Sequence, residues 1–296
     1  MSNTTKAKNR RSVASGFVRT SCATAVLAAV ISTASAAGVN PDPGDYTALP
    51  PGTQLGVVYF QHLSADEVHA RGKKVVNNVD LTLDLGILRY VHFVKIGDWV
   101  ADPQIIVPFG RQKIGLADDV RSGLGDITVG AAFWPLHDLE GRHHFGISTF
   151  VTLPTGSEKD AGFALSANRY AFNLQAGYMR PLGRNWTIDL VAQSEFYSDQ
   201  RNTDARKDAY FSLEASPRYH FSDATSVTLT WRHGWGGKET LNGSTLLDSE
   251  QRDSVILTWA SFLSPKWQLQ MQYRQDFDVQ DGPALTGLQT RLLYVF

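Results

Sequence analysis

Residues 267–274 read Trp-Gln-Leu-Gln-Met-Gln-Tyr-Arg, so every second side chain is apolar and those between them are polar. Such alternation is typical of a β-strand with one apolar and one polar face. The same period recurs from about residue 52 to the end of the chain, and no segment of comparable length has a helical period. The sequence therefore predicts an all-β protein.

Twelve segments share this period, and the connections between them are alternately long and short. This pattern predicts a single antiparallel up-and-down β-barrel with both termini at the short-turn side, which is periplasmic in outer-membrane barrels. The second and third segments are the least regular, because the alternation slips near Leu88 and because Pro103 and Pro108 interrupt it. The segments lie near residues 53–63, 79–92, 97–109, 124–136, 143–153, 168–182, 186–197, 208–221, 225–236, 252–263, 266–276 and 285–296.

A soluble β-sandwich would show the same alternation, but the residue types favour a transmembrane barrel. The apolar faces contain many Ala, Thr and Ser residues, which suit lipid better than a close-packed core. Aromatic residues gather on these faces and at their ends, as in the interfacial girdles of membrane barrels. These aromatic residues are Trp186, Phe196, Trp231, Trp235, Trp259 and Trp267.

The last strand ends in an aromatic pair, Tyr294 and Phe296, on its apolar face. This ending resembles the assembly signal of bacterial outer-membrane barrels. We therefore expect the chain to engage the barrel-assembly machinery and to reside in outer-membrane lipid, in the bacterial cell outer membrane.

Residues 1–36 differ from the rest of the chain. Five Lys or Arg residues are the only charges before Asp42, and the apolar stretch 21–31 precedes Ala34-Ser35-Ala36. This arrangement is typical of a secretory signal peptide, and the apolar stretch is about half the roughly 20 residues that a membrane-spanning helix needs. We expect residues 1–36 to be a cleaved signal peptide, with a retained helical anchor as the alternative.

The expected domains are this signal peptide, a Pro/Gly-rich segment over residues 37–52 and the barrel over residues 53–296. The composition of residues 37–52 favours a disordered periplasmic lead, although the segment could instead enter the lumen as a plug.

Composition excludes several functional classes. A single Cys residue excludes a disulfide scaffold and a Cys-based metal site. The formal net charge of −1 argues against nucleic acid as a partner. His143 and His144 are adjacent on a strand and so point to opposite faces, which prevents them from chelating a metal together. We expect no metal, no cofactor and no catalytic site.

Several stretches together resemble the outer-membrane proteins grouped as the "MetA-pathway of phenol degradation" transporter family. They are GDYTALPPGT over residues 44–53, GLGD over 123–126, PTG over 154–156 and TRLLYVF over 290–296. The resemblance covers about residues 42–296. It implies an outer-membrane barrel of a Gram-negative bacterium that takes up an aromatic or other hydrophobic compound.

If the apolar face of each strand meets lipid, the polar face lines the lumen. The charged side chains there could orient a small solute, or they could form ion pairs that fill a narrow lumen and keep the strands in register. We expect passive uptake of a small, aromatic or hydrophobic solute past these side chains. The lumen-facing candidates are Asp84, Asp189, Glu195, Glu214, Arg218, Arg232, Arg274 and Arg291.

Two other functional classes are open alternatives to transport. An outer-membrane hydrolase would need a Ser–His arrangement, and His144 and Ser148 share one strand face but lie four residues apart. A structural or adhesive barrel would act through its long loops.

Deletion of Phe296 should impair assembly, because it removes the end of the expected assembly signal. Immunoblots of outer-membrane fractions should show less folded barrel for the deletion than for a Phe296→Tyr control. Equal outer-membrane levels of the two variants would show that the C-terminal aromatic is not such a signal.

Overall fold

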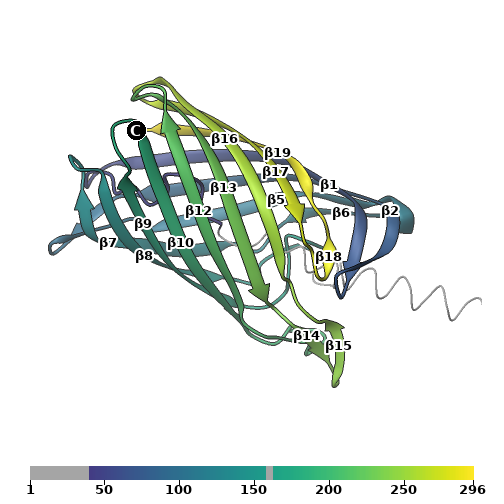
Figure 1. Cartoon of the computed structure of the whole chain (residues 1–296). Helices are drawn as coiled ribbons and strands as arrows, with labels where there is room; N and C mark the ends of the chain where they lie inside the picture. The colour runs from purple at the N-terminus through teal and green to yellow at the C-terminus, as the bar shows by residue number, and fades with distance from the viewer. Residues whose placement is uncertain (1–39, 158–162) are drawn as a thin grey trace, which may run out of the picture.

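The computed structural model describes residues 40–157 and 163–296, and the expected signal peptide lies outside these residues. They form a β-barrel (Figure 1). The barrel wall has twelve antiparallel strands, as the sequence predicts. These are β1 (Gln54–Ala70), β2 (Lys73–His92), β5 (Gln104–Ile114), β7 (Thr128–Asp138), β8 (His143–Thr152), β9 (Ala171–Pro181), β10 (Trp186–Tyr197), β12 (Tyr210–His220), β13 (Thr225–Gly236), β16 (Arg252–Ser264), β17 (Trp267–Phe277) and β19 (Thr286–Val295).

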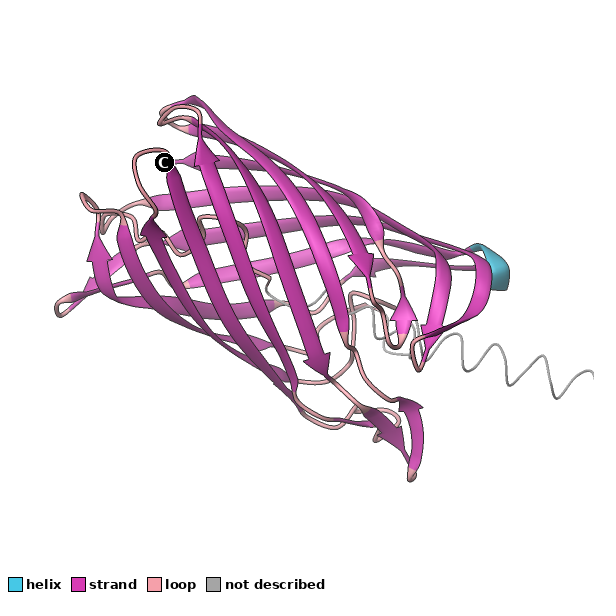
Figure 2. Ribbon diagram, viewed as in Figure 1, coloured by secondary structure: helices cyan, strands magenta, loops and turns pink. Residues whose placement is uncertain are grey.

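The barrel is closed by pairing between its first and last strands. β1 and β19 are antiparallel over an unbroken register that runs from Leu55 opposite Val295 to Ser64 opposite Thr286. Closure removes the free sheet edge, which is the condition for a sheet to cross a membrane. Among the described residues, no helix has the length and apolar character to span a bilayer; the only helical element there is the short 3₁₀ turn η1 (Gly115–Ala117) (Figure 2).

The remaining strands are short or lie outside the wall. β3 (Val94–Ile96) and β4 (Trp99–Ala101) form a hairpin at the short-turn end. β6 (Asp119–Leu124) folds back and pairs with residues 109–114 of β5, and β18 (Gly282–Pro283) pairs with β1. β11 (Arg206–Lys207), β14 (Glu239–Leu241) and β15 (Ser244–Leu247) form a small separate sheet at the long-loop end.

The third wall strand differs from the expected span of residues 97–109. It continues beyond the expected end to Ile114. It is also interrupted at Pro103, although β4 before the proline pairs with β7 in the same register as β5 does, with Ala101 opposite Phe133 and Gln104 opposite Gly130. Proline has no N–H to donate to a strand ladder and fixes its own φ angle. Pro103 therefore interrupts the strand between β4 and β5 without changing its register against β7.

The ladder between β5 and β7 is much shorter than the others. Three residue pairs join these strands, from Gln104 opposite Gly130 to Ile106 opposite Thr128, and two β4–β7 pairs continue the same register toward the short-turn end. Above this point β5 pairs with β6 instead. Pro108 lies where the ladder stops, and its carbonyl oxygen accepts a hydrogen bond from the Gly125 N–H (2.8 Å). Proline has no N–H, so Pro108 cannot donate a hydrogen bond to β7. We call this break between β5 and β7 the seam.

Asp126 fastens the loop that fills the seam. Its carboxylate accepts hydrogen bonds from the backbone N–H groups of Gly156 and Ala167, each at 2.8 Å. Its own N–H donates to the Leu165 carbonyl oxygen at 2.8 Å. The seam is thus held by one carboxylate and a few loop hydrogen bonds rather than by a continuous ladder.

Much of the inner wall of β1, β2 and β5 is apolar, unlike the expected polar lumen. At the long-loop end, Leu63, Leu81 and Leu83 pack against Phe163 and Leu165 of an inward-folded loop. A second apolar cluster, which includes Val57, Tyr59, Phe93 and Trp134, lies at the short-turn end. The lumen therefore has an apolar side as well as a polar one.

Candidate functional site: a plugged lumen

Residues 40–49 run inside the barrel and residues 50–52 are exposed where the chain leads into β1, which corrects the expected periplasmic placement of residues 37–52 for most of the part that the structure describes. Asn40 to Pro43 border a cavity in the lumen, and Thr53 leads into β1 at the short-turn end. Hydrogen bonds join this segment to side chains of β2, β8, β9, β10, β17 and β19. We call residues 40–52 the plug.

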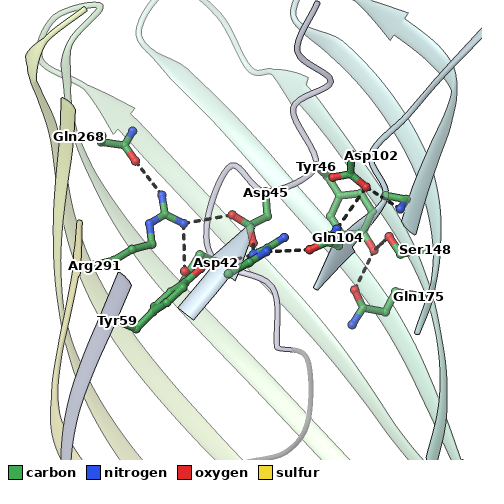
Figure 3. Close-up of polar contacts among 12 residues, drawn as sticks. Asp42, Asp45, Tyr46, Tyr59, Asp102, Gln104, Ser148, Gln175, Gln268 and Arg291 are labelled. Atoms are coloured by element: carbon green, nitrogen blue, oxygen red, sulfur yellow. Dashed lines mark hydrogen bonds and ion pairs between the residues drawn. The ribbon is translucent and has the colours of Figure 1, made fainter. Parts of the chain in front are cut away.

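Tyr46 anchors the plug to the wall at a pair of glycines. Gly146 on β8 lies opposite Gly177 on β9, and both face inward. A Cβ atom at Gly177 would come within 2.3 Å of the Tyr46 ring, so the ring occupies the space that side chains would fill. The Tyr46 hydroxyl bonds with the next inward pair, Ser148 Oγ at 3.0 Å and Gln175 Oε1 at 2.9 Å (Figure 3).

Two plug carboxylates pair with two arginines of the wall. Asp45 accepts hydrogen bonds from Arg89 of β2 (2.8 Å) and from Arg291 of β19 (3.1 Å). Asp42 accepts a second bond from Arg291 at 3.0 Å (Figure 3). Tyr59 of β1, the strand between them, accepts a bond from Arg89 at 3.3 Å. Charge-assisted bonds of this kind are stronger than neutral ones and fix geometry.

The charges of the wall keep the Asp45 carboxyl ionised. Burial alone would raise the pKa of the Asp45 carboxyl, but the guanidinium groups of Arg89 and Arg291 outweigh it and lower that pKa. A lowered carboxyl pKa gives stability that is present above the ordinary value and lost as the pH falls through the lowered one. The ion pairs of Asp45 therefore hold the plug at neutral pH and are lost only when the pH falls below the ordinary pKa of an aspartate.

A cavity of about 200 Å³ lies in the lumen between the plug and the long-loop end. One side of it is apolar and the opposite side is charged. The apolar side consists of Leu63, Leu83, Ile87, Ile106, Pro108 and Leu285. The charged side includes Glu195, Glu214, Arg232, Glu250, Arg252 and Arg274. Four of the lining residues, Ile106, Pro108, Asp126 and Thr128, also flank the seam.

Four of the charged residues expected in the lumen form two ion pairs on adjacent strands. Arg232 of β13 donates to Glu214 Oε2 of β12 from Nε (2.8 Å) and Nη2 (2.6 Å). Arg218 of β12 donates to Asp189 of β10, which also accepts a bond from the plug N–H of Gly44 at 2.8 Å. The Asp189 pair thus holds the plug, and the Glu214 pair borders the cavity.

Three further candidates also lie on the inner wall. Glu195 is buried and receives a bond from Asn173 Nδ2 at 3.5 Å. Arg274 donates to the fully buried carboxylate of Asp276, with Nε at 2.7 Å. Arg291 binds the plug.

Asp84 does not lie in the lumen, which corrects its expected placement. Leu83 and Leu85 on either side of it are buried in the inner apolar cluster, so Asp84 points outward. Its side chain is 57% exposed and contacts His62 at 2.7 Å. The expectation was wrong because it assigned the apolar face of every strand to lipid, whereas on β2 the apolar face is the inner one.

Sequence reasoning missed the plug residues Asp42, Asp45 and Tyr46, and the wall residue Arg89. One available signal was that Asp42 and Asp45 are the only charges in a Pro/Gly-rich segment just before the first strand. The pair considered for a hydrolase is also engaged by the plug: Ser148 bonds Tyr46, and His144 Nδ1 accepts the Ala48 N–H at 3.4 Å.

Gly177→Ala should displace the Tyr46 ring, because the new methyl group would overlap it, at a cost of about 1–3 kcal/mol. We expect higher steady conductance in planar bilayers and altered fluorescence of Trp134, whose Nε1 donates to the Tyr46 carbonyl oxygen. The outward-facing Ala176→Val is the matched control. Unchanged conductance of Gly177→Ala would show that the ring does not hold the plug.

Glu214→Gln and Arg232→Met should each destabilise the barrel by about 3–5 kcal/mol, since each leaves one buried charge without its partner. The double variant should recover most of this loss in urea-induced unfolding. Full stability of both single variants, together with altered ion selectivity, would favour a role in the pore over the structural ion pair.

The fold and sequence have counterparts among known proteins. The model of the family described as "Putative MetA-pathway of phenol degradation" matches residues 65–292. No curated protein matches the sequence. The crystal structure of the COG4313 outer membrane channel from Pseudomonas putida F1 has 34% identity and a TM-score of 0.82, covering 87% of this chain and 100% of that one.

A more distant structure shares the fold alone. The transport unit of the autotransporter AIDA-I from Escherichia coli has 9% identity and a TM-score of 0.52, over 91% of this chain and 98% of that one. The match to the COG4313 channel, by contrast, extends to both sequence and fold. With the family match over residues 65–292, it shows that this chain is a bacterial outer-membrane β-barrel channel that belongs to the MetA-pathway phenol-degradation family.

Proposed function

We propose that this channel takes up a small aromatic or hydrophobic solute passively, through the lumenal cavity and then sideways through the seam between β5 and β7. The observation that carries this proposal is that a cavity with one apolar side is bounded by the plug at one end and, at its side, by the seam, where the ladder between β5 and β7 ends.

The cavity suits a single aromatic ring. Its volume of about 200 Å³ exceeds the about 150 Å³ of an apolar engineered cavity that binds benzene. Leu63, Leu83 and Leu285 offer apolar contact on one side. Burial of the ring there contributes a favourable free energy of about 25 cal/mol per Å² of apolar surface removed from water.

The plug blocks a straight path to the short-turn end, so the solute needs another exit. Pro108 and Asp126 face the cavity and also border the seam. A hydrophobic solute that passes between them reaches the lipid phase without crossing the ion pairs of the plug. Because the ladder with β7 ends at Ile106, an opening beyond this residue breaks few backbone hydrogen bonds between the two strands.

A disulfide across the seam tests this route. Val107 and Ile127 extend the register of Ile106 opposite Thr128 by one residue. Val107 pairs with Leu88 of β2, and the peptide groups of Ile127 bond Leu153 and Thr155, so neither residue is hydrogen-bonded across the seam. Opposite residues without such bonds have close Cβ atoms in antiparallel pairs. Such a pair suits a disulfide. Val107→Cys/Ile127→Cys should lose uptake when oxidised and regain it on reduction, measured as the initial rate of radiolabelled toluene accumulation by intact Gram-negative cells.

Val58→Cys/Leu292→Cys is the matched control, because it crosslinks two directly opposite residues in the continuous β1–β19 ladder. We expect its uptake to be the same in the oxidised and reduced states. If oxidised Val107→Cys/Ile127→Cys accumulates toluene as fast as this control, the seam is not the route. If neither exceeds cells without the channel, the protein does not transport such a solute.

A further inference from the structure

The carboxylate of Asp42 lies in a receptor built from side chains of the wall. Its Oδ1 accepts hydrogen bonds from Gln272 Nε2 at 2.8 Å and from Gln289 Nε2 at 3.3 Å. Its Oδ2 accepts one from Arg291 Nη1 at 3.0 Å. Two neutral amides and one guanidinium thus surround both oxygens of a carboxylate, which is the donor set that recognises such a group.

The amides of this receptor are held in orientation by one another. Gln61 of β1 donates to Gln289 Oε1, Gln289 donates to Gln272 Oε1 at 2.8 Å, and Gln272 donates to Asp42. Each amide therefore turns its N–H toward the next, and the chain of donors ends at the carboxylate. Linked hydrogen bonds of this kind polarise one another in the same direction.

The positive charges of the wall beside Asp42 also favour a bound anion. Arg89 and Arg291 form ion pairs only with plug carboxylates among the described residues. Without the plug, two guanidinium groups would face the lumen without a carboxylate. The carboxylate site therefore belongs to the wall, and Asp42 is its tethered occupant.

The receptor opens onto the apolar side of the cavity. Asp42, Gln272 and Gln289 line the cavity floor. Gln61 of β1 lies opposite Gln289, and the next inward residue of β1 is Leu63. Leu63 lies opposite Leu83 of β2 on one side and Gly287 of β19 on the other. A carboxylate bound at the floor would therefore have an apolar wall directly above it.

We propose that this receptor binds the carboxylate of a small single-ring aromatic acid, which displaces Asp42 and releases the upper part of the plug. The inference deepens the proposed function, on which it rests for the path by which the ligand reaches the cavity. It gives Asp42 the role of a built-in competitor. A tether supplies an effective concentration on the order of millimolar, so a free carboxylate displaces Asp42 only when its ring also binds the apolar wall.

Binding of 4-fluorobenzoate to the full barrel in lipid vesicles, measured by ¹⁹F NMR, tests this receptor. Asp42→Ala should bind 4-fluorobenzoate roughly tenfold or more tightly than the unchanged chain, because the tethered competitor is gone. The neutral 4-fluorobenzyl alcohol should gain nothing. In the Asp42→Ala background, Gln272→Met should abolish the gain, because it removes an amide donor.

Tyr46→Phe is the matched control, since it removes the bonds to Ser148 and Gln175 and loosens the plug without emptying the receptor. An equal gain for Tyr46→Phe would assign tighter binding to plug mobility and overturn the inference. So would an equal gain for the alcohol, or for 4-fluorobenzylamine, or no gain for Asp42→Ala.

Conductance in planar bilayers tests release of the plug. Benzoate should raise the conductance of the unchanged chain, and acetate, which lacks the ring, should not. An equal response to both anions, or to neither, would overturn the proposed displacement.

Different results would refute the carboxylate receptor and the proposed uptake. Toluene uptake that depends on the seam, without any gain of benzoate binding in Asp42→Ala, would refute the carboxylate receptor alone. A gain of benzoate binding in a barrel that accumulates no toluene would leave the receptor and refute the proposed uptake of hydrophobic solutes.

Discussion

Two buried guanidinium groups, Arg89 and Arg291, need carboxylates that the barrel wall does not provide among its described residues. Leaving a buried charge unpaired costs several kcal/mol, so the position of the plug is set by this need. Asp42 and Asp45 meet it from a segment outside the sheet. The position of these two carboxylates closes the lumen at the short-turn end. It thereby leaves the cavity, with its apolar and charged sides, between the plug and the long loops, with the seam at its side.

The strands were predictable because lipid on one side and a lumen on the other impose a period of two on the sequence. This argument found all twelve wall strands, although it ended the third at residue 109 whereas β5 continues to Ile114. It also misplaced Asp84, since it assumes a polar lumen. On β2 the lumen itself is apolar, so the side chains of Leu81 and Leu83 face inward and the face assignment is reversed.

The plug was not predictable by the same argument, because it has no period. Its partners lie far away in sequence: Tyr46 bonds Ser148 and Gln175, and Asp42 bonds Gln272. Its Pro/Gly-rich composition is equally typical of a disordered lead. What distinguishes the two cases is complementarity with the wall, which requires knowing which residues of distant strands share one level of the barrel.

The ring of Tyr46 on Gly146 and Gly177 couples the plug to the wall itself. Glycine within a strand weakens it, because it has no side chain to pack and loses more conformational entropy than other residues. The ring supplies the missing packing, as aromatic side chains do for strand glycines in designed sheets. Coupling between two equilibria is reciprocal. The proposed release of the plug therefore makes β8 and β9 less rigid. A lipid or mutation that acts on the outside of the barrel and stiffens these two strands in the plugged state raises the free energy of plug release.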